Sequence, residues 1–263
     1  MKGIVKVVIL DWAGTTVDFG SMAPVAAFRD AFEAVGLSPG NDLIRRFMGL
    51  PKKDHVRNML QDEEMIEAYL ERYGQTPDEA TVELVYEKFE PAVFKVLGNH
   101  AAPLPGVAET VAYLRDKGIL IGSTTGYTRA MMDVLCPVSE ALGYKPDCYV
   151  CPDDVGSVGR PYPYMIWECL RRLGILDIHE VVKIGDTSAD ILEGRNAGCL
   201  SVGVIYGSNM LGLPEEEYET MSQTERDSLA ETARESYTRA GADYILERFI
   251  DIPDYLEKLR SEL

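Results

Sequence analysis

The sequence predicts an α/β fold, in which helices flank a parallel sheet, with a helical module inserted near the N-terminus. Short β-branched apolar runs with little alternation indicate strands that are buried on both faces. Helical patterns separate most of these runs, as the crossovers of a parallel sheet require. A segment of about residues 21–97 carries helical patterns alone. We therefore predict an α/β core of residues 1–19 and 99–263 and a helical module of residues 20–98.

Six short runs are the predicted strands of the core. They cover residues 4–10, 119–123, 148–151, 181–184, 201–205 and 242–246. One clear helix between two of these strands runs from Val107 to Lys117, with apolar residues on one face and Gly118 as its stop signal.

Three helices can be placed in the inserted module. The first carries Phe28 and Phe32 on one apolar face and ends at Gly36, and the second opens at Pro51. The third begins at Thr76-Pro-Asp-Glu79, which we interpret as a capping box with proline in the first helical position. The apolar face of the first helix is either buried within the module or available to a partner.

Composition limits the classes of function. The chain has 263 residues and a net charge of -17, which argues against a basic surface for nucleic acid or for an anionic membrane. An anionic substrate would need local positive charge from a metal or from a few lysines and arginines. No apolar run approaches the roughly 20 residues of a membrane span, and no signal-peptide pattern is present, so we expect a cytoplasmic protein. The five scattered cysteines indicate reduced thiols.

Polar residues suited to catalysis follow three of the predicted strands. Asp11 follows the first, Ser123–Thr128 follows the second and Gly185–Asp190 follows a later one, while Arg160 precedes a predicted helix. In open α/β sheets, ligands bind at the carboxyl ends of strands. The set suits an aspartate nucleophile, a phosphate-binding hydroxyl, a charge-neutralising arginine and a hard cation. Taken singly, each residue also fits an Asx turn, a helix N-cap or a surface cation.

Taken in order, these motifs resemble those of the haloacid dehalogenase superfamily. The matching residues are Asp11 in DWAGTT, Thr125 in STTGYT, Arg160 in GRPYP, and Asp186 with Asp190 in GDTSAD. The resemblance implies a Rossmann-like parallel sheet core, and the helical module stands at the position of that superfamily's all-helical cap domain.

Ala13 departs from the phosphatases of this superfamily. They usually carry an aspartate two residues after the nucleophile, which protonates the leaving alkoxide. Alanine cannot do this, so either the protein is a binding-only relative or its leaving group is not an alkoxide. Cleavage of a C–P bond leaves electrons on carbon, and a protonated imine on a lysine can accept them.

The stretch Met48-Gly-Leu-Pro-Lys-Lys-Asp-His55 supplies candidate lysines at the start of a predicted helix. An imine-forming lysine must be neutral, whereas a free lysine has a pKa of about 10.4. The helix N-terminus, the adjacency of Lys52 and Lys53, and desolvation under a closed cap would each lower that pKa. The ordinary alternative is an exposed helix start that carries two lysines.

Several stretches together closely resemble the phosphonoacetaldehyde hydrolase (phosphonatase) family over nearly the whole chain. They are DWAGTTVDFGS, MGLPKKDH, GSTTGYTR, PDDV, GRPYP, GDTSAD and GSNMLGL. That family has alanine at the Ala13 position and a Schiff-base lysine in its cap, which its spacing from Met48 and His55 places at Lys52. Family members commonly have leucine where this chain has Pro51 and an apolar residue where it has Lys53.

This second resemblance implies C–P bond hydrolysis of a small phosphonate, phosphonoacetaldehyde, with Mg²⁺ as cofactor. The implied catalytic residues are Asp11, Lys52 and His55. The implied metal ligands are Asp11, the backbone carbonyl of Ala13 and Asp186, with Asp190 one helical turn beyond as direct or supporting ligand. The implied substrate contacts are Met48, Thr125, Gly126, Tyr127 and Arg160. For Met48, a place in a helix core is an equal alternative. The family also implies a homodimer through the cap.

Two other functions remain open at this stage. The first is a Mg²⁺-dependent phosphate-ester phosphatase or phosphomutase, against which Ala13 argues. The second is a non-catalytic relative that binds an anion or a partner protein, against which the intact Asp11, Arg160 and Asp186 argue.

Overall fold

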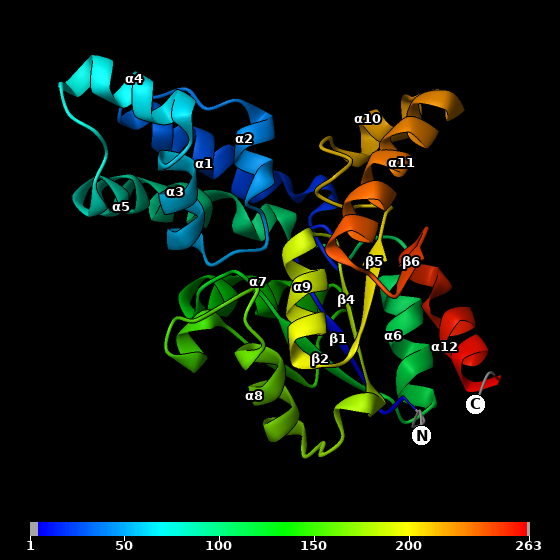
Figure 1. The fold of residues 1–263 in the computed structure, drawn as a ribbon. Coiled ribbons are helices and arrows are strands. Elements are labelled where there is room, and N and C mark those ends of the chain that lie inside the picture. The colour runs from blue at the N-terminus through cyan, green and yellow to red at the C-terminus, as the bar shows by residue number, and fades with distance from the viewer. Residues whose placement is uncertain (1–4, 262–263) are drawn as a thin grey trace.

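The computed structural model describes residues 5–261 and confirms the predicted fold class. Its core is a six-stranded, fully parallel sheet in the order β3-β2-β1-β4-β5-β6 (Figure 1). The strands are β1 (Val7–Leu10), β2 (Leu120–Thr124), β3 (Cys148–Val150), β4 (Val181–Gly185), β5 (Leu200–Val204) and β6 (Tyr244–Leu246). The predicted strands are confirmed with ends shifted by up to three residues, although Ile4 lies outside the described residues.

The central strand β1 is buried on both faces, as its unbroken apolar run predicts. Val7 and Ile9 pack on one side with the apolar residues of α8 (Tyr164–Leu173). Val8 and Leu10 point to the other side, where α6 (Val107–Asp116) contributes to the same cluster. This alternation follows from the two-residue period of a strand.

Helices and short 3₁₀ turns connect the strands. The remaining core helices are α7 (Arg129–Ala141), α9 (Ser188–Ala197), α10 (Glu215–Thr220), α11 (Gln223–Ala240) and α12 (Ile252–Ser261), and the 3₁₀ turns are η3 (Pro152–Val155), η4 (Ile178–Glu180) and η5 (Phe249–Asp251). α8 and α9 contact the same face of the sheet, whereas α6 and α12 pack together near the other (Figure 1).

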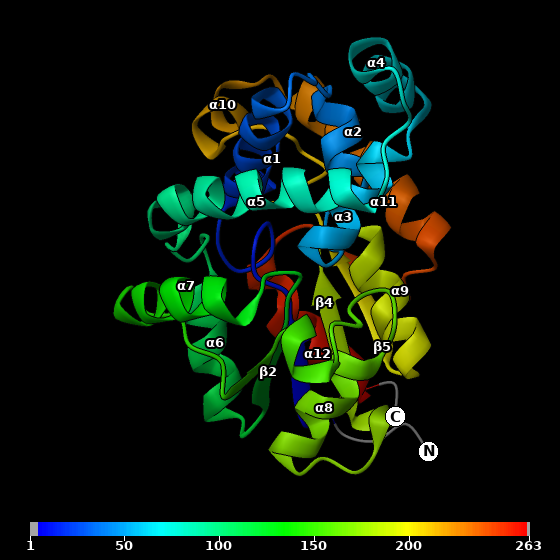
Figure 2. The same cartoon turned by 90° about the vertical axis from the view of Figure 1, so that its left-hand side faces the viewer.

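The inserted segment between β1 and α6 is entirely helical, as predicted. It contains α1 (Met22–Ala34), α2 (Asn41–Arg46), α3 (Lys52–Leu60), α4 (Glu63–Tyr73) and α5 (Glu79–Val96), flanked by the turns η1 (Phe19–Ser21) and η2 (Leu97–His100). These helices form a cap above the α/β core, and α3 and α5 lie on the side of the cap that faces the core (Figure 2). The division at residues 19/20 and 98/99 stays a prediction.

The apolar face of α1 is buried inside the cap. Phe28 and Phe32 are fully buried, and the ring of Phe28 stacks on that of Phe89 from α5 at 4.2 Å. This face is therefore not free to contact a partner chain. The exposed apolar residues of the cap are Leu70, Tyr73 and Leu84 instead.

The start of α5 differs from the prediction. Asp78, not Thr76, is the N-cap residue: its carboxylate accepts from the backbone N–H of Thr81 at 2.9 Å, and the Thr81 hydroxyl accepts from the Asp78 N–H. Pro77 therefore lies outside the helix. Aspartate caps a helix at least as well as threonine, and here it has a hydroxyl three residues on to complete the box.

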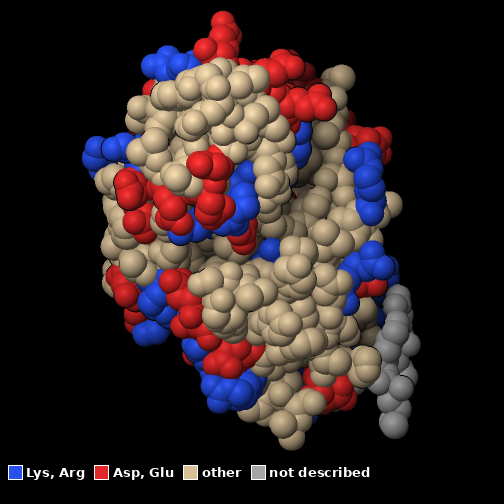
Figure 3. Space-filling view, turned by 60° about the vertical axis from the view of Figure 1, so that its left-hand side comes forward, with Lys and Arg blue, Asp and Glu red and all other residues tan. Residues whose placement is uncertain are grey.

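Charged side chains of both signs are interspersed over the face shown in Figure 3, and uncharged side chains cover much of its lower half. Within the described part of the chain, no helix is long and apolar enough to cross a membrane.

Candidate active site

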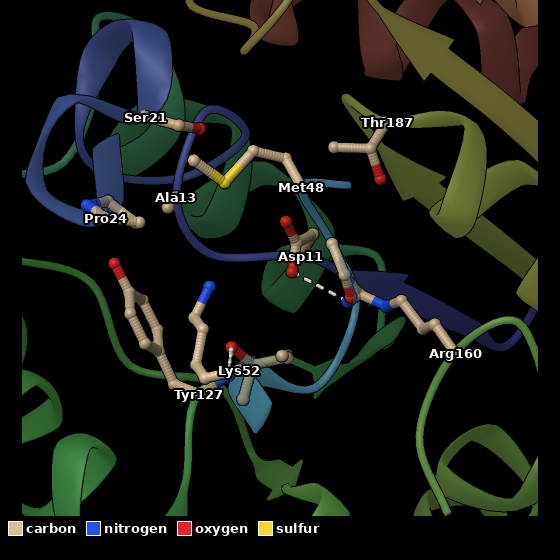
Figure 4. Close-up of a pocket in the computed structure, with 12 residues that line it drawn as sticks. Asp11, Ala13, Ser21, Pro24, Met48, Lys52, Tyr127, Arg160 and Thr187 are labelled. Carbon is tan, nitrogen blue, oxygen red and sulfur yellow. Dashed lines mark hydrogen bonds and ion pairs between the residues drawn. The ribbon is translucent and has the colours of Figure 1, made fainter. Parts of the chain in front are cut away.

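The strand order brings the predicted motifs together. The order 3-2-1-4-5-6 changes direction beside β1, and the loops after β1, β2 and β4 leave the sheet at this switch point. A small pocket opens there, at the edge of the sheet where open α/β folds bind their ligands. Its lining residues, shown in Figure 4, are Asp11, Ala13, Ser21, Pro24, Met48, Gly49, Lys52, Thr125, Gly126, Tyr127, Arg160 and Thr187.

Core and cap both contribute to this pocket. Asp11 follows β1 and Thr125 follows β2, whereas Met48 and Lys52 come from the loop and helix of the cap that face them. Eight of the predicted site residues line the pocket. His55, Asp186 and Asp190 lie behind its wall, while the lining residues Ser21, Pro24, Gly49 and Thr187 were not predicted.

Asp11 is paired with Arg160. The guanidinium Nη2 lies 2.7 Å from Asp11 Oδ1 and 2.6 Å from the Thr124 carbonyl, while Nη1 faces Asp190 at 3.1 Å and Nε faces Glu193 at 2.9 Å. Each nitrogen of the Arg160 guanidinium therefore already contacts an acceptor within the protein. It fixes the Asp11 carboxylate and places a positive charge beside it.

A buried ionic cluster supports this arginine. Lys183, in the middle of β4, lies 2.8 Å from Asp190 Oδ1 and 3.4 Å from Glu193 Oε2, and it donates to the Thr124 hydroxyl. Lys183, Asp190 and Glu193 are all fully buried. Sequence reasoning missed Lys183, Glu193 and Thr124, although a lysine inside an apolar strand is a signal that could have found the first.

Three carboxylates form a possible cation site. Oxygens of Asp11, Asp186 and Asp190 lie within 4.8 Å of one another. Burial and the two neighbouring carboxylates raise the pKa of Asp186 well above its ordinary value. Burial acts to raise the pKa of Asp190 as well, but the charges of Arg160 and Lys183 outweigh burial and lower this pKa below its ordinary value.

The partners of these carboxylates differ in charge. Asp186 accepts from the neutral donors Thr15 Oγ1, at 3.0 Å, and Asn209 N–H, at 2.7 Å, whereas Asp190 is already paired with two cations. Asp11 has one cationic partner, Arg160, so the unmet demand for positive charge is greatest at Asp186. An all-oxygen donor set of this kind fits Mg²⁺. Asp186 is not an N-cap, since Thr187 caps α9.

Lys52 is buried and points into the pocket. It is the first residue of α3 and only 5% exposed. Its Nζ stands over the Tyr127 ring, 4.6 Å from the centroid, and 5.9 Å from the Phe28 centroid (Figure 4). Burial lowers the pKa of Lys52 to about 8, with a further contribution from Arg160, although Asp11 opposes the shift.

Lys53 turns away from the pocket. Its Nζ lies 2.5 Å from Glu83 and 5.6 Å from the Tyr86 centroid, on the outer side of the cap. Of the three features that the sequence offered, desolvation is the largest cause of the lowered pKa of Lys52, and the positive charge that adds to it is that of Arg160 in the core.

His55 lies one helical turn after Lys52. Its ring is fully buried, 3.9 Å from the Phe28 ring, and Nε2 lies 2.7 Å from the Ile44 carbonyl. Because a carbonyl only accepts, Nε2 carries the hydrogen. Burial and Lys52 lower the pKa of His55 well below its ordinary value, so the ring is neutral. Its Nδ1 has no hydrogen-bond partner within residues 5–261 and is free to accept a hydrogen bond.

The other predicted contacts also lie at the pocket. The Thr125 hydroxyl accepts from the Tyr127 N–H at 3.1 Å, and Met48 both lines the pocket and packs in the main hydrophobic cluster. Gly126 packs against the cap so closely that an added Cβ would lie 2.5 Å from the Leu50 carbonyl oxygen. The cap is thus closed over the core.

The parallel sheet, the aspartate after β1 and the helical cap define a class of hydrolases. Residues 5–198 match the haloacid dehalogenase-like hydrolase family, and the chain belongs to that family.

Individual relatives of known name show to which branch of this family the chain belongs. The chain is 43% identical over 258 residues to a phosphonoacetaldehyde hydrolase of Bacillus cytotoxicus, covering 98% of this chain and 97% of that protein. It is 42% identical, with the same coverage, to a phosphonoacetaldehyde hydrolase of Bacillus cereus. A phosphonoacetaldehyde hydrolase-like protein of Oleispira antarctica has a solved structure with a TM-score of 0.96 and 32% identity, over 99% of this chain and 94% of that one. The chain is therefore an enzyme of the phosphonoacetaldehyde hydrolase family.

Proposed function

We propose that this enzyme hydrolyses the C–P bond of phosphonoacetaldehyde to acetaldehyde and phosphate. The observation that carries the proposal is the buried Lys52 amine, which faces the same small pocket as Asp11 and Ala13. An amine with a pKa of about 8 is partly neutral near pH 7.5, and a neutral amine can attack an aldehyde. The alanine fits a reaction whose leaving group is carbon.

The first part of the mechanism forms an imine. The neutral amine of Lys52 attacks the aldehyde carbon, and the carbonyl oxygen leaves as water to give a protonated imine. The free Nδ1 of His55 accepts and returns the protons that move in this step. The neutral phenol of Tyr127 covers the imine, since burial raises the pKa of Tyr127 well above its ordinary value.

The second part cleaves the C–P bond. An oxygen of Asp11 attacks phosphorus, and the electron pair of the C–P bond passes to the protonated imine, which becomes an enamine. Asp11 now carries the phosphoryl group as a mixed anhydride. Water hydrolyses the anhydride to phosphate and restores Asp11. The enamine carbon takes up a proton, and water releases acetaldehyde from Lys52.

The surrounding charges suit this reaction. Arg160 holds Asp11 in place and offsets the negative charge of the phosphonate, while the Thr125 hydroxyl lies beside the phosphoryl group. Mg²⁺, held by Asp11, Asp186 and the Ala13 carbonyl, would supply Lewis-acid stabilisation of the phosphoryl oxygens. Asp190, already paired with Arg160 and Lys183, would support this site from behind.

The proposed division of labour follows the proposed domains. The core, residues 1–19 and 99–263, would carry the phosphoryl chemistry, and the cap, residues 20–98, would carry the imine chemistry. A cytoplasmic homodimer that forms through the cap stays part of this proposal, with Leu70, Tyr73 and Leu84 as the exposed apolar residues available there.

Reduction with borohydride tests the imine. The protein is incubated with phosphonoacetaldehyde and sodium borohydride, and the modified residue is mapped by mass spectrometry. We expect an ethyl or phosphonoethyl group on Lys52, loss of activity, and no adduct in a Lys52→Arg variant, with Lys53→Ala as the matched control that keeps the adduct. An adduct on Lys53 would overturn the assignment of Lys52. The absence of any adduct, together with Mg²⁺-dependent hydrolysis of a phosphate ester, would overturn the proposed reaction.

A further inference from the structure

Arg45 links the cap to a core loop that the proposed chemistry leaves without a role. It lies near the end of α2, and its side chain crosses to the segment after β5 that contains GSNMLGL. Its Nη1 donates to Asn209 Oδ1 at 2.9 Å and to the Asn209 carbonyl at 3.2 Å, and its Nη2 donates to the Gly212 carbonyl at 3.0 Å. Nη1 also lies 2.6 Å from the Gly20 carbonyl, at the junction between core and cap.

Asn209 contacts the cap and the candidate metal site at once. Its side-chain Nδ2 donates to the Arg45 carbonyl at 3.2 Å, so that Asn209 binds both the side chain and the main chain of Arg45. Its backbone N–H donates to Asp186 Oδ2 at 2.7 Å. Asn209 is only 2% exposed. Asn209 therefore connects the end of α2 to Asp186, a candidate metal ligand.

The end of α2 leads directly into the segment that carries Lys52. The carbonyl of Arg45 also accepts from the Met48 N–H at 3.2 Å, at the start of the turn before α3. This turn rests on the core, because a Cβ added to Gly49 would lie 2.4 Å from Thr187 Oγ1. The position of Arg45 relative to the core thus sets the position of Lys52 relative to Asp11.

We propose that Arg45 and Asn209 are positioning residues that form a latch: they hold the cap closed and set the position of Lys52 relative to Asp11 and Asp186. The role rests on the proposed function, since the position of Lys52 relative to Asp11 matters only if cap and core residues act on one substrate. Neither residue lines the pocket. The arginine provides a planar fork that engages several acceptors at once, which a lysine cannot reproduce.

Hydrogen exchange tests the latch without reference to activity. The variants are Arg45→Met, Arg45→Lys and Asn209→Ala, and the matched control is Arg46→Met. Arg46 is the next residue of α2, but it is exposed and pairs with Asp62 inside the cap at 2.9 Å. We expect amide exchange in residues 47–50 and 207–212 to rise about tenfold or more in the three latch variants, as the loss of hydrogen bonds to a charged group implies. The control should match the wild type.

Kinetics and metal binding give the second readout. We expect KM for phosphonoacetaldehyde and the Mg²⁺ dissociation constant, measured by titration calorimetry, to rise severalfold in the latch variants. The double variant Arg45→Met/Asn209→Ala should be no worse than either single variant, because both break one unit. If Arg45→Met does not fold, Arg45→Lys carries the test.

Two results would overturn the latch. One is unchanged exchange in residues 207–212 in every latch variant. The other is strictly additive losses in the double variant. If the wild type itself does not hydrolyse phosphonoacetaldehyde, the proposed function fails, but the exchange data still decide whether the latch exists.

Discussion

The ε-amino group of Lys52 is buried beside Arg160, and this lowers its pKa to about 8. The neutral form, which predominates above that pH, is the one that attacks an aldehyde. We therefore expect the rate of imine trapping by borohydride to rise from pH 6 through a midpoint near pH 8 and then to level off. At pH 7 roughly a tenth of the amine is neutral, against less than about 0.1% for an unperturbed lysine.

An Asp11→Asn variant provides a control for this midpoint. Asp11 raises the pKa of Lys52, so the removal of its charge should move the midpoint of trapping to lower pH. Trapping does not require attack at phosphorus and stays measurable in this variant. A midpoint near pH 10 in the wild type would show that the amine is not desolvated in solution.

Ala13 lines the same pocket as Lys52, and its small apolar side chain keeps a further negative charge away from the amine. An Ala13→Asp variant adds a carboxylate that favours the charged lysine and raises its pKa. We expect kcat/KM at pH 7 to fall about tenfold or more and the pH profile to shift toward alkaline pH. Ala13→Asn has the same size without the charge and should keep the wild-type midpoint. Equal shifts in both variants would contradict this electrostatic account.

The residues at strand ends could be predicted from sequence, and the residues that support them could not. Asp11, Thr125 and Asp186 follow apolar runs, so the geometry of a parallel sheet alone brings them together. Glu193 lies on α9, where a helical carboxylate is ordinary, and only the fold shows that it faces Arg160. The direction of Lys53 likewise depends on Glu83, thirty residues away in the sequence.

At the scale of elements, a buried ion cluster joins β4 to α9 and holds Arg160. Lys183→Met keeps the length of the side chain but leaves Asp190 and Glu193 short of one cation in a fully buried place. Removal of one partner of a buried pair typically lowers the free energy of unfolding by about 3–5 kcal/mol. We expect a loss of about 3 kcal/mol in urea denaturation.

A surface lysine provides the comparison. Lys145 pairs with Glu140 at 2.7 Å, but both side chains are about half exposed. Lys145→Met should leave the free energy of unfolding close to that of the wild type, because water screens an exposed pair. Equal losses in the two variants would contradict the view that burial of the cluster, rather than the number of ion pairs, matters here.

The elements themselves follow from sequence patterns, but their ends depend on local competition. The apolar runs locate all six strands, whereas the start of α5 was misplaced by two residues because Thr76 and Asp78 are both good caps. Each has a possible partner three residues on, but Glu79, the partner of Thr76, pairs with Arg57 of α3 instead. Thr81 supplies a hydroxyl to Asp78, and tertiary contacts then bury Thr81 against the Tyr69 hydroxyl at 3.1 Å.

At the scale of the whole molecule, the site exists only when the cap lies on the core. Asp11 and Arg160 come from the core, and Lys52 and His55 come from the cap. No pattern within either segment specifies how the two meet. Many of the contacts that do so pair a side chain with a backbone atom, such as Arg160 Nη1 with the Gly49 carbonyl at 3.5 Å. The sequence shows the side chain of such a pair but not its backbone partner.

Gly126 offers a test of closure that leaves the core and the cap each intact. An added Cβ would lie 2.5 Å from the Leu50 carbonyl oxygen and 3.0 Å from that of Gly49, both in the cap. These contacts exist only in the closed form, so Gly126→Ala should fold normally and open the cap. We expect kcat/KM to fall at least about 100-fold, while the free energy of unfolding changes by less than about 1 kcal/mol.

Gly40→Ala is the matched control, because nothing lies within 4 Å of the Cβ position at Gly40 in the cap. It should retain wild-type kinetics. Borohydride trapping separates the two steps that closure serves. If closure is needed to desolvate Lys52, the pKa of the amine in Gly126→Ala returns toward 10.5, and trapping at pH 7 falls together with hydrolysis. If Gly126→Ala traps the imine and turns over like the wild type, the closed arrangement is not the one that acts.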